Sequence, residues 1–165
     1  MRASPLVLKD YFTTEFRFSA QPGFNLKSPS EATILPSDIA VAVEQLLTPD
    51  DSHARSYQIT VQLEPSVVEK FPWTFHISLV GFFEVLPSWP DDQIDRLFVA
   101  NAPALLYSAA RESLSMVSGH GPYTRALLPS ITFVPRPEEK VEETESQPSK
   151  DDSPTNGTGL PNTGI

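Results

Sequence analysis

Cysteine is absent from this sequence of 165 residues. Its absence excludes disulfide frameworks, thiolate metal sites and cysteine nucleophiles. Long apolar runs are absent too: none approaches the ~20 residues that a membrane-spanning helix needs. The first twenty residues also lack the basic start and unbroken apolar run of a secretory signal. These absences predict a cytoplasmic protein that does not insert into membranes.

Basic residues are scarce. The chain has 12 Lys and Arg against 21 Asp and Glu, which gives a formal net charge of −9. This charge disfavours nucleic acid and anionic membranes as partners, because both are themselves negatively charged. The three histidines, His53, His76 and His120, are scattered without a second ligand at metal spacing. We therefore expect no metal and no cofactor.

Catalytic groups are also hard to place. Ser108 and Ser113 lie inside a helical pattern rather than at a strand-to-helix elbow, where a nucleophilic serine sits. Asp91 and Asp92 are adjacent at a helix start, where capping is their ordinary role. No glycine-rich phosphate loop is present. The sequence therefore predicts that the protein is not an enzyme.

Proline is abundant, with 17 residues, and the composition changes abruptly after Pro135. Residues 136–165 have seven acidic and three basic residues and no aromatic residue, so they cannot bury enough apolar surface to offset their ordering entropy. The sequence thus predicts a folded domain over 1–135 and a disordered acidic tail over 136–165. Within the tail, LPNTG at 160–164 matches a sortase signal, either by chance or as an engineered tag.

Four segments have the alternation or the β-branched composition of strands: residues 10–20, 38–47, 57–65 and 73–85. In the first segment, alternation places Phe12, Phe16 and Phe18 on one face. In the last segment, Gly81 indicates either a bulge or a close backbone contact.

The hydrophobic period then changes to that of a helix. Residues 90–102 and 101–122 both have helical patterns, and the second carries an apolar stripe at helical spacing: Leu106, Ala110, Leu114 and Val117. We expect Asn101 to cap this second stretch and Pro103 to lie in its first turn. The predicted fold is α+β, a four-stranded antiparallel meander backed by one long or broken C-terminal helix.

One helical layer covers only one face of such a sheet. Phe82 is predicted to point to the side opposite Trp73 and Phe83, so the last strand carries large apolar groups on both faces. The uncovered face must meet water, a second subunit or a ligand.

The segment 101–133 combines a proline, apolar pair, aromatic and Ala-Arg-Glu pattern with a glycine-rich turn and a Pro-x-x-Phe-like ending: Pro103, Leu105, Leu106, Tyr107, Ala110, Arg111, Glu112, Val117, Gly119, Pro122, Leu128, Pro129 and Phe133. In these features it resembles the SecB family of export chaperones. Upstream, residues 81–85 and 11–20 look like the fourth and first strands of that family. The resemblance covers about 8–134.

This resemblance implies a sheet backed by helices that assembles as a homotetramer, a dimer of dimers. It implies apolar grooves that bind unfolded client polypeptides, without a cofactor, and delivery to a SecA-like motor in protein export. Some relatives instead serve toxin–antitoxin systems. The sequence departs from SecB after Phe133, where the second amphipathic helix of that family has no counterpart.

Two functions stay open: a SecB-like chaperone of unfolded polypeptides, or a SecB-fold adaptor or toxin–antitoxin chaperone with one dedicated partner. Under either, three aromatic residues are predicted to bind peptide: Phe24, Trp73 and Phe82. Glu15 is predicted to contact a partner protein. Four helix residues are predicted to form the oligomer interface: Leu106, Tyr107, Ala110 and Leu114.

Overall fold

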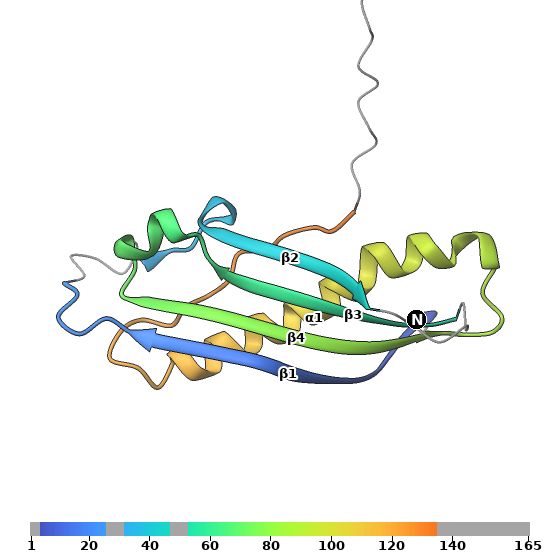
Figure 1. The fold of residues 1–165 in the computed structure, drawn as a ribbon, viewed down its shortest axis with the longest axis horizontal. Coiled ribbons are helices and arrows are strands. Elements are labelled where there is room, and N and C mark those ends of the chain that lie inside the picture. Colours follow the sequence, from blue (N-terminus) through green and yellow to red (C-terminus); the bar gives the residue numbers. More distant parts are fainter. Residues whose placement is uncertain (1–3, 26–31, 47–52, 135–165) are drawn as a thin grey trace, which may run out of the picture. The chain divides into compact units, whose positions relative to one another are not determined.

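The computed structural model describes residues 4–25, 32–46 and 53–134. By its internal contacts the chain divides into Met1–Pro135 and Arg136–Ile165. The predicted acidic tail and its LPNTG motif lie outside the described residues. Within the first unit, four strands precede one long helix, which confirms the α+β class (Figure 1).

The four strands form a single antiparallel sheet. They are β1 (Leu6–Ala20), β2 (Ile39–Leu46), β3 (Ala54–Leu63) and β4 (Trp73–Val85). Their order across the sheet is β1-β4-β3-β2. The meander therefore comprises β2, β3 and β4, whereas β1 pairs with the far side of β4 (Figure 1).

Proline and alternation set the limits of β3. Its buried and half-exposed side chains alternate up to Leu63, as the sequence predicts. Pro65 then opens the short 3-10 helix η3 (Pro65–Lys70), because its ring removes the N–H that a further ladder bond would need. A second short 3-10 helix, η2 (Pro36–Asp38), also begins with a proline, and it leads into β2.

The helix α1 (Ile94–Ser118) is continuous and follows the 3-10 turn η4 (Asp91–Gln93). It runs through Pro103 without a break, so the long helix is the correct alternative. The cap predicted at Asn101 is wrong. Asn101 lies inside the helix, and its side-chain Nδ2 donates to the carbonyl oxygen of Leu97 at 2.8 Å.

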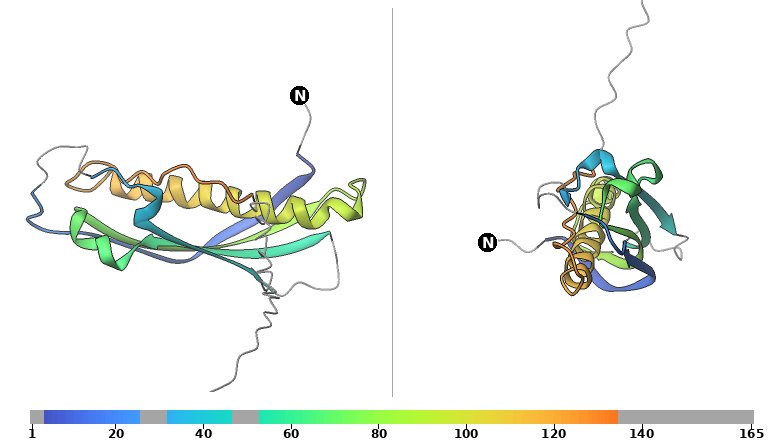
Figure 2. Two further views of the ribbon diagram at one scale, coloured as in Figure 1. Left: turned by 90° about the horizontal axis from the view of Figure 1, so that it is seen from above. Right: turned by 90° about the vertical axis from the view of Figure 1, so that its left-hand side faces the viewer.

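One face of the sheet is covered by α1, which packs across β1, β3 and β4 (Figure 2). The segment 123–134 then returns beside α1 on the same face (Figure 2). The backbone N–H of Ala126 donates to Ser118 Oγ at 2.9 Å, which ties the start of this return to the helix end. Residues 119–134 form no second helix, and the residues after Val134, where the sequence predicts no counterpart to the second helix of SecB, lie outside the described residues.

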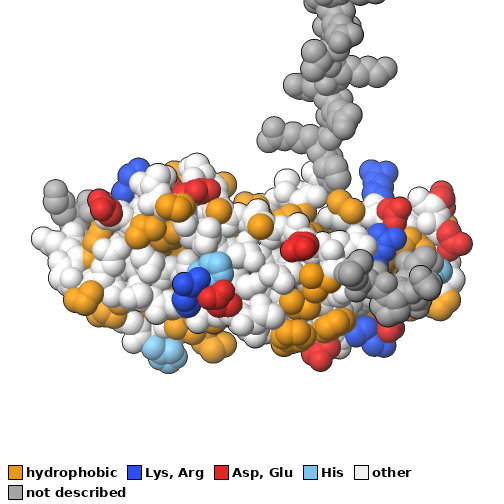
Figure 3. Space-filling view, in the orientation of Figure 1, with side chains coloured by type: hydrophobic (Ala, Val, Ile, Leu, Met, Phe, Trp, Pro, Cys, Tyr) orange, Lys and Arg blue, Asp and Glu red, His pale blue; other side chains and the backbone are white. Residues whose placement is uncertain are grey.

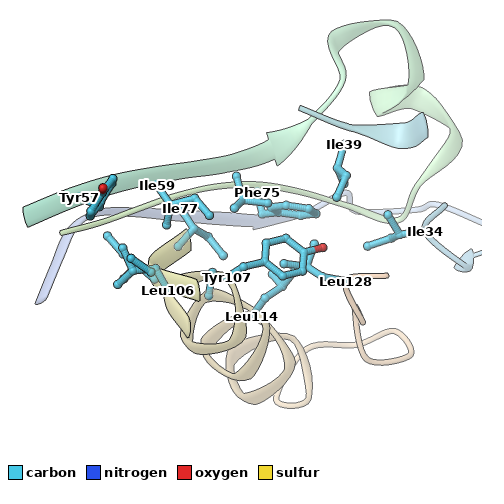
Figure 4. Close-up of a cluster of buried hydrophobic side chains, with 14 of the residues drawn as sticks. Ile34, Ile39, Tyr57, Ile59, Phe75, Ile77, Leu106, Tyr107, Leu114 and Leu128 are labelled. Carbon is cyan, nitrogen blue, oxygen red and sulfur yellow. The ribbon is translucent and has the colours of Figure 1, made fainter. Parts of the chain in front are cut away.

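The hydrophobic core lies between α1 and the sheet. Side chains from β3 and β4, such as Ile59 and Ile77, meet Leu106 and Leu114 of the helix, and Leu128 closes the cluster from the returning segment (Figure 4). Each of these five is essentially inaccessible to solvent. The burial of such side chains, each contributing about 1.5–3 kcal/mol, is the main stabilising term of the fold.

Gly81 lets the helix approach the sheet closely. A Cβ atom built on it would lie 2.6 Å from Leu106 Cδ2 and 3.0 Å from the Phe83 ring. The pairing of β4 with β3 is unbroken at this position. Of the two alternatives drawn from the sequence, close contact is therefore correct at Gly81.

We expect Gly81→Ala to lower the free energy of unfolding by about 1–3 kcal/mol, because the methyl group overpacks the contact with Leu106. Urea denaturation measures the change. In a Leu106→Ala background the same substitution should cost clearly less, because the clashing group is gone. An equal loss of unfolding free energy in both backgrounds would contradict a clash with Leu106 as the cause.

Candidate peptide-binding surface

Two β-bulges shape β1. Its pairing with β4 skips one residue between Leu8 and Asp10 and another between Thr13 and Glu15. The extra residues are Lys9 and Thr14. Because side chains alternate along a strand, each extra residue moves every following side chain to the other face of the sheet.

The bulges turn Phe12 away from the helix. Phe16 pairs with Ile77 on the covered face, whereas Phe12 pairs with Val80 on the opposite face. The prediction that Phe12 shares a face with Phe16 and Phe18 is thus wrong for Phe12. A period-two pattern assumes an unbroken ladder, and the extra Thr14 breaks it.

The face of the sheet opposite α1, which we call the open face, is the side drawn in Figure 1. No element of the described residues covers it. Figure 3 shows hydrophobic side chains in separate groups on this face, with charged side chains between them. Along β1 and β4 the register assigns it these residues: Val7, Asp10, Phe12, Glu15, Arg17, Ser19, Thr74, His76, Ser78, Val80, Phe82 and Glu84.

Two phenylalanine rings contact each other on the open face. The ring centroids of Phe12 and Phe82 lie 5.9 Å apart at a tilt of 33°. The two residues are 49% and 42% exposed, whereas Val80 between them is only 5% exposed. We call Phe12, Val80 and Phe82 the aromatic patch. Phe82 thus lies on the surface, where a peptide-binding role requires it.

Charged side chains lie next to the aromatic patch along the same two strands. The Glu15 carboxylate is 2.8 Å from Arg17 Nε and 3.1 Å from His76 Nε2. The other ring nitrogen of His76, Nδ1, is 2.8 Å from Gln62 Oε1 of β3. Glu15, the predicted partner contact, is therefore exposed but already engaged with two side chains of its own sheet.

A hollow of about 490 Å³ lies beyond this charged group. Its lining comes from three strands and combines three phenylalanines, Phe16, Phe18 and Phe75, with five polar residues: Arg17, Ser19, Gln62, Thr74 and His76. Glu15 is not among the residues that line it. The lining therefore offers one guanidinium, two hydroxyls, an amide and an imidazole, a set rich in hydrogen-bond donors.

Phe24 lies away from the aromatic patch. It follows the Ala20 end of β1, and its half-buried ring meets the edge of Tyr123 at 6.3 Å. Phe82 is near the opposite end of the same pairing, where it lies across from Asp10. The structure therefore does not join Phe24 and Phe82 in one site.

Trp73 belongs to the core. It is 1% exposed, its ring stacks on Phe71 at 5.4 Å, and its Nε1 donates to the carbonyl oxygen of Thr124 at 3.3 Å. It points to the covered face together with Phe75. The structure corrects the choice of Trp73 as a peptide contact, because the helix and the returning segment already occupy its surroundings.

The helix residues predicted for an oligomer interface are buried within this chain. The stripe packs on its own sheet and on the returning segment, so it offers no accessible surface: Leu106, Tyr107, Ala110 and Leu114. A stripe that covers its own sheet has the same spacing as one that meets a partner. The structure therefore assigns these four residues to packing within the chain.

Tyr107 illustrates this packing role. Its hydroxyl donates to the carbonyl oxygen of Pro129 at 2.8 Å. Burial raises the pKa of Tyr107 to about 12, which the nearby charge of Arg111 only partly opposes. The phenol therefore stays protonated at physiological pH and ties α1 to the returning segment.

Metal and membrane sites are not found in the part of the chain that the structure describes. Over residues 4–25, 32–46 and 53–134, no group of three or more His, Asp or Glu is placed to hold a metal ion. In the same ranges no helix has the length and hydropathy needed to cross a bilayer.

Sequence reasoning missed Phe12 and the hollow. The sequence does hold a signal for the two bulges of β1. The large residues that face the helix are even-numbered at Leu6 and Leu8, odd-numbered at Tyr11 and even-numbered again at Phe16 and Phe18. The hollow has no such signal, because its lining combines single residues from strands far apart in the sequence.

No protein-family model matches the chain, and no curated protein matches it. Among the solved structures that are similar to the chain are two that share 12% identity with it. The SecB-like chaperone Rv1957 of Mycobacterium tuberculosis, solved with a ChAD peptide from the Rv1956 HigA1 antitoxin, matches 81% of this chain and 93% of its own, with a TM-score of 0.48. A protein of unknown function from Streptococcus agalactiae matches 78% of this chain and 100% of its own, with a TM-score of 0.41.

We expect the variant Trp89→Phe, in which Trp73 is the remaining tryptophan, to emit at short wavelength and to resist quenching by acrylamide. The reason is that Trp73 is enclosed by the helix layer, whereas Trp89 is only half-buried. Stern–Volmer quenching measures the difference, with the urea-unfolded variant as the fully exposed reference. Quenching as strong as in that reference would show that the Trp73 side chain is exposed and would contradict its burial.

Proposed function

We propose that this protein is a SecB-like chaperone that binds an extended apolar segment of a dedicated partner on the open face of its sheet. The observation that carries the proposal is the exposed pair of Phe12 and Phe82 on a face that no described element covers. The resemblance of 101–133 to the SecB family supports the same class of function.

The physical reason for binding is the half-exposed state of the two rings. A phenylalanine ring contributes roughly 200 Å² when buried, so the pair leaves about 200 Å² of aromatic surface in water. Covering it yields about 25 cal/mol per Å², or roughly 5 kcal/mol before the cost of ordering a peptide. That gain suits one or two apolar side chains of an incoming segment.

The size of the aromatic patch favours a dedicated partner. A stable protein–protein interface buries about 800 Å² on each side, several times the surface that the two rings expose. A general chaperone of unfolded chains needs long apolar tracts instead. A short segment with an apolar residue fits the patch, and neighbouring polar groups can then select among such segments.

A general holdase is the second candidate. It is favoured by large apolar residues exposed elsewhere on the domain, which enlarge the surface for unfolded clients: Leu35, Met116, Leu127 and Val134. Action in the cytoplasm, delivery to a SecA-like motor and assembly as a dimer of dimers are further proposals of this candidate, and they rest on the resemblance. Sedimentation analysis of the purified chain measures the assembly.

We expect Phe82→Ser to weaken binding of selected peptides by about tenfold or more, because it removes roughly half of the aromatic surface. Peptides are selected by display against the wild-type protein, and affinities are measured by calorimetry. Met116→Ser is the control, since it removes an apolar side chain from α1 that is even more exposed than Phe82, 60% against 42%. Urea denaturation confirms that both variants stay folded.

The selected sequences separate the two candidates. A dedicated partner predicts one shared motif and little effect on the aggregation of heated citrate synthase. A general holdase predicts varied apolar sequences and strong suppression of that aggregation. If Phe82→Ser and Met116→Ser weaken binding equally, the open face is not the binding surface.

A further inference from the structure

We propose that the open face carries a two-part site, which binds an extended segment with an apolar side chain at the aromatic patch and an acidic side chain at the polar hollow. This inference rests on the proposed function and names the chemistry of the partner. Its two parts are held by the same two strands, β1 and β4, so their separation is set by the sheet.

The separation fits a short extended peptide. Phe12 pairs with Val80 and Arg17 pairs with His76, so the two parts are four positions apart along β4 (80 − 76). At ~3.3 Å per residue this is ~13 Å. An extended ligand whose two anchoring residues are at positions i and i+4, with three residues between them, spans the same distance and turns both side chains to one face, because alternation has a period of two.

The hollow favours an acceptor over a donor. Arg17 is 70% exposed at its side chain and supplies a permanent positive charge. Ser19 and Thr74 face each other across β1 and β4 and add two hydroxyls to the lining. A carboxylate accepts hydrogen bonds from all of these groups, whereas an ammonium group would meet Arg17 as a like charge.

Glu15 does not fill the hollow. Its carboxylate contacts Arg17 through Nε and His76 through Nε2, and it lies outside the lining. These contacts hold both side chains at the rim of the hollow. Because the guanidinium remains largely exposed, a second carboxylate can approach it from the solvent side.

The partner chemistry follows from the two parts together. The segment carries a phenylalanine, leucine or similar side chain, then an Asp or Glu four residues along the chain. The acidic group is a side chain, since the hollow lies on the open surface of the sheet and a chain can continue past it.

The test uses three peptides with acetylated and amidated ends, so that no terminal charge contributes: GFTSTEG, GFTSTQG and GFTSTKG. Affinities for the full chain are measured by calorimetry or by NMR titration at low salt. We expect the Glu peptide to bind about fivefold more tightly than the Gln peptide and the Lys peptide to bind most weakly, in keeping with a partly exposed ion pair.

Arg17→Gln should remove the preference for Glu over Gln, whereas Met116→Ser should keep it. Raising the salt concentration should reduce the preference in the wild-type protein, because the ion pair is screened. Arg17 is exposed on an edge strand, so the variant is expected to fold, and its urea midpoint checks this.

The outcomes separate this inference from the proposed function. If the Glu and Gln peptides bind equally and Phe82→Ser weakens both, the inference is overturned and peptide binding at the aromatic patch stands. If none of the three peptides binds the wild-type protein, binding at the patch fails and the inference fails with it. If the preference for Glu survives Arg17→Gln, the carboxylate is bound elsewhere and the inference is again overturned.

Discussion

The contact between one helix and one face of the sheet is the constraint on which the rest of the structure depends. Leu106 reaches the backbone of β4 because Gly81 has no side chain to block it. This close approach lets a single helix, with the segment that returns beside it, enclose Trp73 and the other large side chains of the covered face. Among the described residues α1 lies on that side and no element covers the open face, which leaves its side chains accessible to a partner.

The two bulges of β1 decide what the open face presents. Without Lys9 and Thr14 as extra residues, Phe12 would have the parity of Leu8 and Phe16 and would face the helix. With them, a single aromatic side chain moves outward to meet Phe82, and the strand then returns to its original parity. The side chains of a short stretch of β1 thus exchange faces, while the residues before and after it still point into the core.

Much of this fold could be predicted from the sequence, because alternation and helical periodicity are local. The alternation of β3 and the helical pattern of α1 were visible in this way, whereas the sequence left open whether the helix is broken and whether Gly81 marks a bulge or a close contact. The strand order could not be predicted, since the pairing of β1 with β4 joins residues that are between 53 (73 − 20) and 79 (85 − 6) positions apart in the sequence. The site was harder still. Burial of Trp73 and of the stripe through Leu114 depends on the position of α1, and composition cannot distinguish a core from an interface.

The same bulges also bear on why an exposed aromatic pair is tolerated. A long edge strand with unpaired backbone groups invites pairing with other chains, and bulges interrupt the regular edge that such pairing needs. The irregular edge of β1 and the net charge of −9 both oppose aggregation. In the proposed site, the side chains of the open face determine which segments bind, because Phe12 and Phe82 supply apolar surface and Arg17 supplies a positive charge. The bulges that expose Phe12 thus also reduce the tendency of the β1 edge to pair with other chains and aggregate.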